Sequence, residues 1–238
     1  MEQYQRIELL IGKQGLERLR KACVLVVGCG GVGSYAVEAL ARSGVGKVVV
    51  VDKDVVSLSN LNRQIMATYE TVGKDKTLMM KKRVESYADC EIICVNKFFD
   101  ERCGDLLVDV DYVIDAIDTM TCKIELIKMC HEHKVPFVVC LGMANRLDPS
   151  MLEYTRLDKT SYDPVAKVMR QLVKKERINY RIPVIFSREI PIKQNVEVDE
   201  NGKTMKDRIP PASMIFVPAA AGLLAASVAM RHLLDKLQ

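Results

Sequence analysis

Short apolar runs alternate with amphipathic segments along the first 150 residues. Between the apolar runs at 24–27 and 47–51, Val37, Leu40 and Ala41 recur at helical spacing. A strand, a helix and a second strand within about 30 residues form a βαβ unit. Strands that are apolar throughout are typical of a parallel sheet with both faces covered. Similar apolar runs predict strands at residues 91–95, 112–114 and 137–141.

These elements predict an α/β fold, a doubly wound, mostly parallel, Rossmann-like sheet with helices on both faces. The alternation supplies four or five parallel strands. We expect a single domain over residues 1–238, in which residues 1–150 form one half and residues 151–238 an elaborated second half. Three further helices are expected, at residues 5–21, 71–88 and 121–133. The first of them is interrupted at Gly12 and Gly15.

The pattern changes after about residue 150. Asp163-Pro164 predicts the start of a basic helix that continues to about residue 178. Residues 188–212 are polar and rich in turn-forming residues, which predicts a mobile loop. The Ala- and Leu-rich stretch 219–236 predicts a final helix that packs on the sheet.

The composition is that of a globular chain. Hydrophobic residues make up 49% and charged residues 28% of the 238, which excludes a disordered chain. The longest apolar run, Ile215–Met230, has sixteen residues and contains Pro218 and Gly222, whereas a membrane-spanning helix needs about 20 apolar residues. The N-terminus lacks the apolar core of a secretory signal, so we expect no membrane contact and a cytoplasmic location. The formal net charge is only +4, so a polyanionic partner must be argued from local clusters.

The chain has eight cysteines, several of them inside apolar runs, and contains no Cys-x-x-Cys pair. A buried free cysteine behaves as a small hydrophobic residue. We therefore expect reduced structural thiols, with a zinc site as the less favoured alternative.

A glycine-rich turn follows the first predicted strand. Gly28, Gly30, Gly31 and Gly33 form the pattern Gly-x-Gly-Gly-x-Gly directly before a predicted helix. Glycine permits a tight turn and a close approach of backbone N–H groups to phosphate, at a helix N-terminus that attracts anions. Asp52, at the end of the second strand, is placed for a ribose hydroxyl. The sequence predicts a nucleotide site here, with a purely structural turn as the alternative, and the turn alone does not select the nucleotide.

The residues beyond Asp52 favour ATP over a nicotinamide dinucleotide. They supply cationic and amide donors for phosphate oxygens and a carboxylate suited to a metal ion. This set of groups fits in-line attack on a phosphorus atom of ATP, in which the protein neutralises charge and positions the reactants. The residues that supply this chemistry are Asp54, Asn60, Arg63, either Lys74 or Lys76, and Asp118.

The spaced motifs resemble those of the adenylating superfamily that contains the ubiquitin-activating enzymes and the bacterial ThiF and MoeB proteins. Five occur in order within about residues 5–150: Gly-x-Gly-Gly-x-Gly, Asp-x-Asp, Ser-Asn-Leu-Asn-Arg-Gln, Gly-x-x-Lys and Ala-Ile-Asp. The resemblance implies ATP and Mg²⁺ as cofactors. It implies that Asp52 holds the ribose, that Asn60, Arg63 and Lys76 hold phosphates, and that Asp118 positions Mg²⁺; Arg63, Lys76 and Asp118 are then the catalytic residues.

The same resemblance implies a homodimer in which Arg6 reaches the ATP of the partner. Each site residue also has a plainer interpretation. Arg63 could be a solvated loop charge, and Lys76 a surface residue with Lys74 as its rival for the phosphate. Asp118 could cap the helix that follows it. Because the motifs occur together and in order, we favour the ligand-binding interpretation.

The second half extends the resemblance to one branch of the superfamily. The segments Leu157–Lys167, Phe186–Glu189 and Ser213–Gly222 resemble the tRNA threonylcarbamoyladenosine dehydratases. The resemblance implies that AMP is transferred from ATP to the side-chain carboxylate of the modified nucleoside, and that the carbamoyl nitrogen then closes a hydantoin ring and releases AMP. The alternative branch activates the C-terminus of ubiquitin-like sulfur carriers, and its usual paired Cys-x-x-Cys motifs are missing here.

A tRNA partner has partly independent support. Residues 151–185 carry eight basic and four acidic residues. Within them, Lys167, Arg170, Lys174 and Arg177 are spaced to share one helix face, and Lys175 lies beside them. A basic helix face suits a phosphate backbone, although it could also be only a solvated surface.

Two further functions remain as alternatives. One is an NAD-dependent oxidoreductase, for which none of the three histidines is an obvious base at a hydride site. The other is a non-catalytic protein that binds tRNA or a protein partner. The resemblance leaves open whether a protein of a sulfur-relay (cysteine desulfurase) system also binds.

Overall fold

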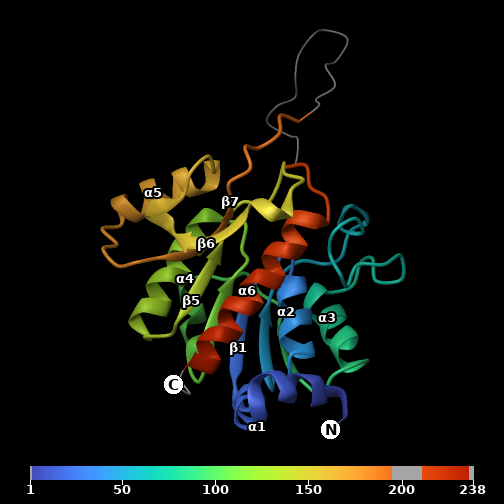
Figure 1. Ribbon diagram of the computed structural model, residues 1–238. Coiled ribbons are helices and arrows are strands. Elements are labelled where there is room, and N and C mark those ends of the chain that lie inside the picture. Colours follow the sequence, from blue (N-terminus) through green and yellow to red (C-terminus); the bar gives the residue numbers. More distant parts are fainter. Residues whose placement is uncertain (1, 195–210, 236–238) are drawn as a thin grey trace.

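The computed structural model describes residues 2–194 and 211–235, and its central element is one seven-stranded sheet (Figure 1). The strand order is β3-β2-β1-β4-β5-β7-β6, and every neighbouring pair is parallel except β6 and β7. This confirms the predicted fold class. The strands are β1 (Cys23–Val27), β2 (Lys47–Val51), β3 (Glu91–Val95), β4 (Tyr112–Asp115), β5 (Phe137–Cys140), β6 (Leu152–Arg156) and β7 (Pro183–Ser187).

Helices cover both faces of the sheet, and two separate layers of core result. On one face, α1, α2, α3 and α6 pack over the alternate residues of the strands. On the other face lie α4, α5 and the 3-10 segment η3 (Glu101–Leu107). The helices are α1 (Gln5–Lys21), α2 (Gly33–Arg42), α3 (Lys76–Glu85), α4 (Met120–Glu132), α5 (Pro164–Lys175) and α6 (Phe216–Asp235).

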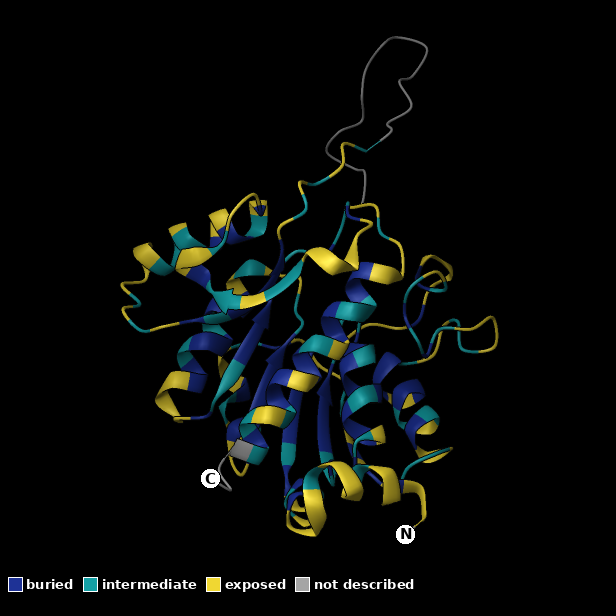
Figure 2. Ribbon diagram, in the orientation of Figure 1, coloured by how far each residue is buried: buried dark blue, intermediate teal, exposed yellow. Residues whose placement is uncertain are grey.

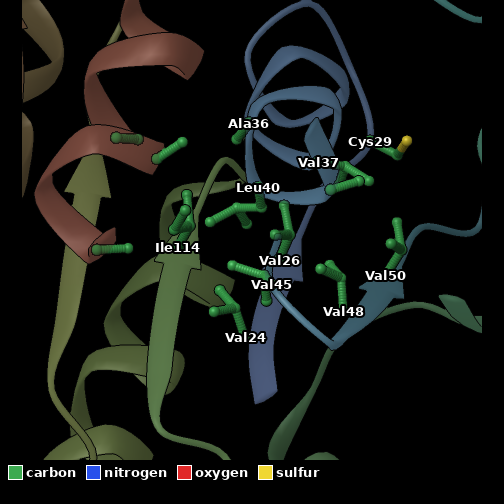
Figure 3. Packing of buried hydrophobic residues seen from close by; sticks show 14 of the residues in the cluster. Val24, Val26, Cys29, Ala36, Val37, Leu40, Val45, Val48, Val50 and Ile114 are labelled. Carbon is green, nitrogen blue, oxygen red and sulfur yellow. The ribbon is translucent and has the colours of Figure 1, made fainter. Parts of the chain in front are cut away.

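The strands β1 and β2 are apolar throughout because both of their faces are covered. Val24 and Val26 of β1 point into the layer beneath α2, where they meet Val37 and Leu40 (Figure 3). Leu25 of β1 belongs to the opposite core layer. Side chains alternate between the two faces of a strand, so a run of consecutive valines fills both layers at once.

The final helix is part of the core. α6 lies against α2 and across β4 and β5, as predicted for the Ala- and Leu-rich stretch (Figure 1). Within it, residues 216–234 are long and apolar enough to cross a membrane by length and composition, with a mean hydropathy of 1.4. However, 56% of that stretch is buried inside the protein. One side of the helix is dark blue and the other yellow in Figure 2, which is typical of a helix that packs on a sheet.

Several predicted boundaries are wrong. The helix predicted at 71–88 covers only α3, because Gly73 adopts a φ of 82° and Asp75 bridges to Val55 before the helix begins. The predicted basic helix ends with α5 at Lys175, and Arg177 has a φ of 55°, outside helical geometry.

Other expectations have mixed outcomes. α1 bends at Gly12, as predicted, where the backbone leaves helical geometry, but it continues through Gly15, where an interruption was also predicted. The strands β6 and β7 were not predicted. Of the predicted loop at 188–212, the described residues on either side contain no helix or strand, and residues 195–210 lie outside the described residues.

Candidate active site

The glycine turn lies where the order of the strands reverses. Val27, the last residue of β1, pairs with Val51 of β2 on one side and with Asp115 of β4 on the other. The chain that leaves each strand therefore flanks the turn: Asp52 follows β2, and residues 116–118 follow β4. Ligands of open α/β sheets bind in the crevice at such a reversal point.

Two of the four glycines are required by the turn itself. Gly28 has a φ of 93°, and a Cβ there would lie 2.5 Å from the carbonyl oxygen of Ala116. A Cβ on Gly33 would collide with the carbonyl oxygen of Gly28. By contrast, the nearest atom to a Cβ on Gly30 is Nε2 of Gln64, 3.9 Å away. A Cβ would thus fit at Gly30 without a collision, so the turn does not itself require this glycine, and its lack of a side chain would let a phosphate group approach the backbone.

Asp52 is held against the turn by two backbone N–H groups. Its Oδ2 accepts a hydrogen bond from the Cys29 N–H at 2.6 Å, and its Oδ1 accepts one from the Asp54 N–H at 2.8 Å. The side chain of Asp52 is half-buried. Because each carboxylate oxygen can accept more than one hydrogen bond, Asp52 keeps acceptor capacity for a hydroxyl.

Lys76 points toward the segment that follows Asp52. Its Nζ lies 2.9 Å from Oδ2 of Asp54, and its backbone N–H donates to the Asp54 carbonyl at 3.1 Å. Lys76 is buried at the start of α3, whereas Lys74 is exposed in the preceding turn. Of the two lysines left open by the sequence, the one buried beside the acidic segment is Lys76.

Arg63 lies on a loop that touches the glycine turn. Its Cγ is 3.4 Å from the position of a Cβ on Gly31. Its Nη1 donates to the Ser59 carbonyl at 2.8 Å and to Oδ1 of Asn62 at 2.9 Å. Within the described residues, the other guanidinium nitrogens of Arg63 make no hydrogen bond to protein, which leaves them for an anionic ligand.

Asn60 shapes the same loop. Its Oδ1 accepts from the Ser57 N–H at 3.0 Å and closes a capping box around the short 3-10 helix η2 (Leu58–Asn60). The side chain of Asn60 is buried. The side-chain oxygen of Asn60 therefore has a structural role, and its side-chain NH₂ group remains as a hydrogen-bond donor.

The loop also meets the chain that enters α6. Nδ2 of Asn62 donates to the Ser213 carbonyl at 2.8 Å. Asn145, after β5, exchanges hydrogen bonds with Ala212 and accepts one from the Ile192 N–H at 2.8 Å. Residues 212–213 are thereby held next to Asn62, so the start of α6 borders the site.

Asp118 is exposed in the β4–α4 connection, two residues before α4 begins. Its Oδ1 accepts a hydrogen bond from the Thr119 hydroxyl at 3.2 Å. The N-cap residue of α4 is Thr119, and it makes no capping hydrogen bond through its side chain. Asp118 is thus not occupied as a helix cap, and its carboxylate faces solvent near the glycine turn.

Arg6 does not join these residues within one chain. It is exposed on α1, which packs beneath the loop that precedes β2, as the contact of Leu16 with Gly44 shows. That loop is at the amino ends of the strands, at the opposite edge of the sheet from the glycine turn (Figure 1).

The predicted tRNA-binding side chains divide into two groups. Lys167, Lys174 and Lys175 are exposed on α5, and Arg177 is exposed just beyond it. Arg170 is half-buried, and its guanidinium donates to the Leu157 carbonyl and to Thr160. A cavity of about 600 Å³ beside α5 is lined by Arg170 and Lys174 together with Arg156 and Arg181. These last two are among the eight basic residues of 151–185 but were not among the predicted tRNA-binding residues.

Asp115 and Lys123 form a buried ion pair that was not predicted. Nζ of Lys123 lies 2.9 Å from Oδ1 of Asp115, and each side chain is 1% exposed. Burial raises the pKa of Asp115, and the nearby Lys123 ammonium opposes that increase. The only available signal was an acidic residue at the end of a strand and a lysine eight positions later, which is not specific.

The residues that the structure describes give little support to the alternative zinc site or to an oxidoreductase. These residues contain no group of three or more His, Cys, Asp or Glu side chains arranged to hold a metal ion. All eight cysteines are free thiols, and six of them are buried. His131 and His133 lie at the C-terminal end of α4, and His232 lies 5.3 Å from the Tyr112 ring, at the amino end of β4. All three are therefore away from the glycine turn.

Comparison with known proteins finds relatives that match this chain over its whole length. The ThiF family profile matches residues 3–236. A tRNA threonylcarbamoyladenosine dehydratase of Bacillus subtilis is 42% identical over 100% of this chain and 97% of its own length. One of Haemophilus influenzae is 32% identical, covering 99% of this chain and 94% of its own. The crystal structure of the Escherichia coli tRNA N6-threonylcarbamoyladenosine dehydratase in complex with ATP superposes with a TM-score of 0.88 at 30% identity, covering 99% of this chain and 95% of that one.

Proposed function

The chain belongs to the ThiF family, and from this membership we propose that it catalyses the ATP-dependent dehydration of threonylcarbamoyladenosine in tRNA to its cyclic hydantoin form. The observation that carries the proposal is the end-to-end match to a dehydratase, which includes the second half of the chain as well as the nucleotide site. The enzyme uses ATP, and the contacts around its glycine turn support this site: Asp52 accepts a hydrogen bond from Cys29, Arg63 packs against Gly31, and Lys76 pairs with Asp54.

The chemistry follows from the poor reactivity of a carboxylate. A carboxylate oxygen of the modified nucleoside attacks the α-phosphorus of ATP, and pyrophosphate leaves. The product is a mixed anhydride whose leaving group is AMP. The carbamoyl nitrogen then attacks the activated carbonyl carbon, loses its proton and expels AMP. The original carboxylate oxygen departs in AMP, so the nucleoside loses one molecule of water, and holding both reacting groups in one bound side chain favours the ring closure.

The proposed roles of the site residues come from their positions. Asp52 accepts a ribose hydroxyl, and the Gly30 and Gly31 region receives the phosphates at the N-terminus of α2. Arg63 and Lys76 stabilise negative charge on the phosphates as pyrophosphate leaves. Asn60 adds an amide donor, and Asp54 holds Lys76 in place.

We also propose Mg²⁺ as a cofactor, with Asp118 as its protein ligand. An exposed carboxylate beside a phosphate site fits this ion, because Mg²⁺ is usually held by one or two carboxylates together with substrate phosphates. When bound, the ion neutralises phosphate charge.

The proposed partners are tRNA and a second copy of the chain. The cationic side chains on and near α5 suit a phosphate backbone. In a homodimer Arg6 would serve the site of the other copy, which agrees with its exposure on α1 beside Leu9 and Leu10, 83% and 84% exposed. Analytical ultracentrifugation tests the dimer, and adding a purified cysteine desulfurase and its acceptor protein tests the sulfur-relay partner. We further propose a cytoplasmic location, where tRNA is found.

The decisive experiment incubates the protein with tRNA that carries threonylcarbamoyladenosine, ATP and Mg²⁺, and analyses the digested nucleosides by mass spectrometry. We expect a nucleoside lighter by one water and an equal amount of AMP. Arg63→Ala and Asp118→Ala should abolish both products. Arg102→Ala, which removes an exposed ion pair on η3, is the matched control and should retain them.

Other outcomes would point elsewhere. An unchanged nucleoside together with adenylation of an added ubiquitin-like sulfur carrier would favour the alternative branch of the family. Binding of tRNA without consumption of ATP would favour a non-catalytic role.

A further inference from the structure

The buried ion pair of Asp115 and Lys123 joins three elements at the carboxyl edge of the sheet. Asp115 is the last residue of β4, and Lys123 lies in the first turn of α4. Nζ of Lys123 donates to Oδ1 of Asp115 at 2.9 Å and to the carbonyl of Cys140, the last residue of β5, at 2.7 Å. The lysine therefore fixes the start of α4 to the ends of two neighbouring strands.

The same carboxylate also folds the connection that carries Asp118. Oδ1 of Asp115 accepts a hydrogen bond from the Ile117 N–H at 3.0 Å, so a single oxygen anchors both the beginning of the connection and the helix that ends it. At the first residue of the connection, the Ala116 N–H donates to the Val27 carbonyl at 2.8 Å. The Ala116 carbonyl lies so close to Gly28 that a Cβ there would be only 2.5 Å away. The connection is thus one wall of the glycine turn.

Burying the charges of Asp115 and Lys123 costs free energy, so stability alone does not explain why the pair is buried. Removing two charged groups from water is unfavourable, and a buried ion pair often contributes less to stability than apolar residues of similar volume would. Oδ2 of Asp115 is buried and has no hydrogen-bond partner among the described residues, which adds to the cost. A pair of this kind is better explained by the geometry that it imposes than by the stability that it adds.

We propose that Asp115 and Lys123 are positioning residues for the reaction: they hold residues 116–118 against the glycine turn so that the Asp118 carboxylate lies at the phosphates. Each side chain is only 1% exposed, so we expect neither to contact the ligand. The inference rests on the proposed function. It predicts that loss of the pair affects turnover far more than the binding of ATP, because a shift of about 1 Å in a reacting group can lower a rate about 100-fold.

The obvious variant, Lys123→Met, leaves a buried carboxylate without its partner and is expected to destabilise the fold. The informative variant is therefore Asp115→Asn with Lys123→Met, which removes both charges and keeps an oxygen for the Ile117 N–H. We expect this double variant to remain folded. The kcat of AMP release should fall about 100-fold while the KM for ATP changes less than about threefold.

The matched control is Lys128→Met on the same helix. It removes a half-exposed ion pair with Glu176, 2.7 Å long, at the far end of α4, and kcat should remain at the wild-type value. Thermal unfolding of each variant identifies the folded fraction, so that kcat is expressed per folded molecule.

Three outcomes separate the possibilities. If the folded double variant keeps the wild-type kcat, or if kcat and the affinity for ATP fall together, the positioning role is refuted. The wild-type protein is assayed first with the modified tRNA. If it releases no AMP, the proposed function is wrong, and the variants are not compared.

Discussion

Lys76 and Asp54 form an ion pair in which the lysine is buried and the aspartate is exposed. Their Nζ–Oδ2 distance is 2.9 Å, and the exposed fractions of the two side chains are 7% and 52%. The exposed carboxylate holds a cationic group in place beside the glycine turn without enclosing it. Lys76 is therefore oriented before a ligand arrives, which is the requirement for stabilising charge that develops on a phosphate.

Replacement of Lys76 tests this arrangement. Lys76→Met should lower kcat/KM for ATP about 100-fold, because it removes a positioned positive charge from the site. The free energy of unfolding should change by less than about 1 kcal/mol, since Asp54 remains solvated. Lys74→Met is the control, and AMP release by it should stay within about twofold of wild type. Equal losses in the two variants would contradict the assignment.

The glycines of the turn should separate into two classes. Gly33→Ala places a methyl group on the Gly28 carbonyl and should lower the free energy of unfolding by about 3 kcal/mol or more. Gly30→Ala meets no atom closer than 3.9 Å and should change it by less than about 1 kcal/mol. It should nevertheless weaken ATP binding about tenfold, because the methyl group occupies the space for phosphate. Urea unfolding and calorimetric titration with ATP measure the two effects.

Basic residues of α5 should also differ in their roles. Lys174 is exposed, so Lys174→Ala should weaken tRNA binding and reduce the slope of log affinity against log salt by about 1. Arg170 donates to the Leu157 carbonyl and to Thr160, so Arg170→Ala should also destabilise the fold. Lys82→Ala, exposed on α3, is the control and should leave the salt dependence unchanged. Filter binding at several salt concentrations provides the measurement.

Acid should weaken the contact between α2 and α3 through Glu38. Burial favours a raised pKa for Glu38, but hydrogen bonds from Arg83, Tyr87 and Arg42 outweigh burial and lower the pKa from its ordinary value of 4.5. A carboxyl with a lowered pKa in the folded state contributes stability above its unfolded pKa and loses it as pH falls through the folded value.

Glu38→Gln should therefore be less stable than wild type by about 1–2 kcal/mol at pH 7. The difference should narrow as pH falls below 4.5. Glu85→Gln, in an exposed ion pair with Lys81, should show no such dependence. Urea unfolding at a series of pH values tests this, and a difference that stays constant down to acid pH would contradict the role of Glu38.

The local sequence pattern was sufficient to predict those elements whose structure depends on residues close together in the chain. The apolar runs identified five strands of the sheet, since a run buried on both faces carries its own signature. The glycine turn and Asp52 followed from the βαβ order, because the end of one strand and the start of one helix place them.

Tertiary contacts decided the rest. β6 mixes apolar and polar residues, and β7 begins with a proline, so neither carries the full signature of the predicted strands. They become strands by pairing with each other and, for β7, with β5. α3 begins at Lys76, later in the chain than predicted, because Asp75 forms a β-bridge with Val55. The helix that was expected to carry Arg177 ends before it, at Lys175.

The sequence by itself thus determined the fold class, the family and the chemical groups available for a nucleotide. It did not determine that Lys76 is anchored by Asp54, that Lys123 crosses from α4 to Asp115 and β5, or that Arg6 lies at the opposite edge of the sheet from the glycine turn. These relationships join residues whose spacing has no periodicity, and only the packing of helices on the sheet brings their charged atoms within hydrogen-bond distance or keeps them apart.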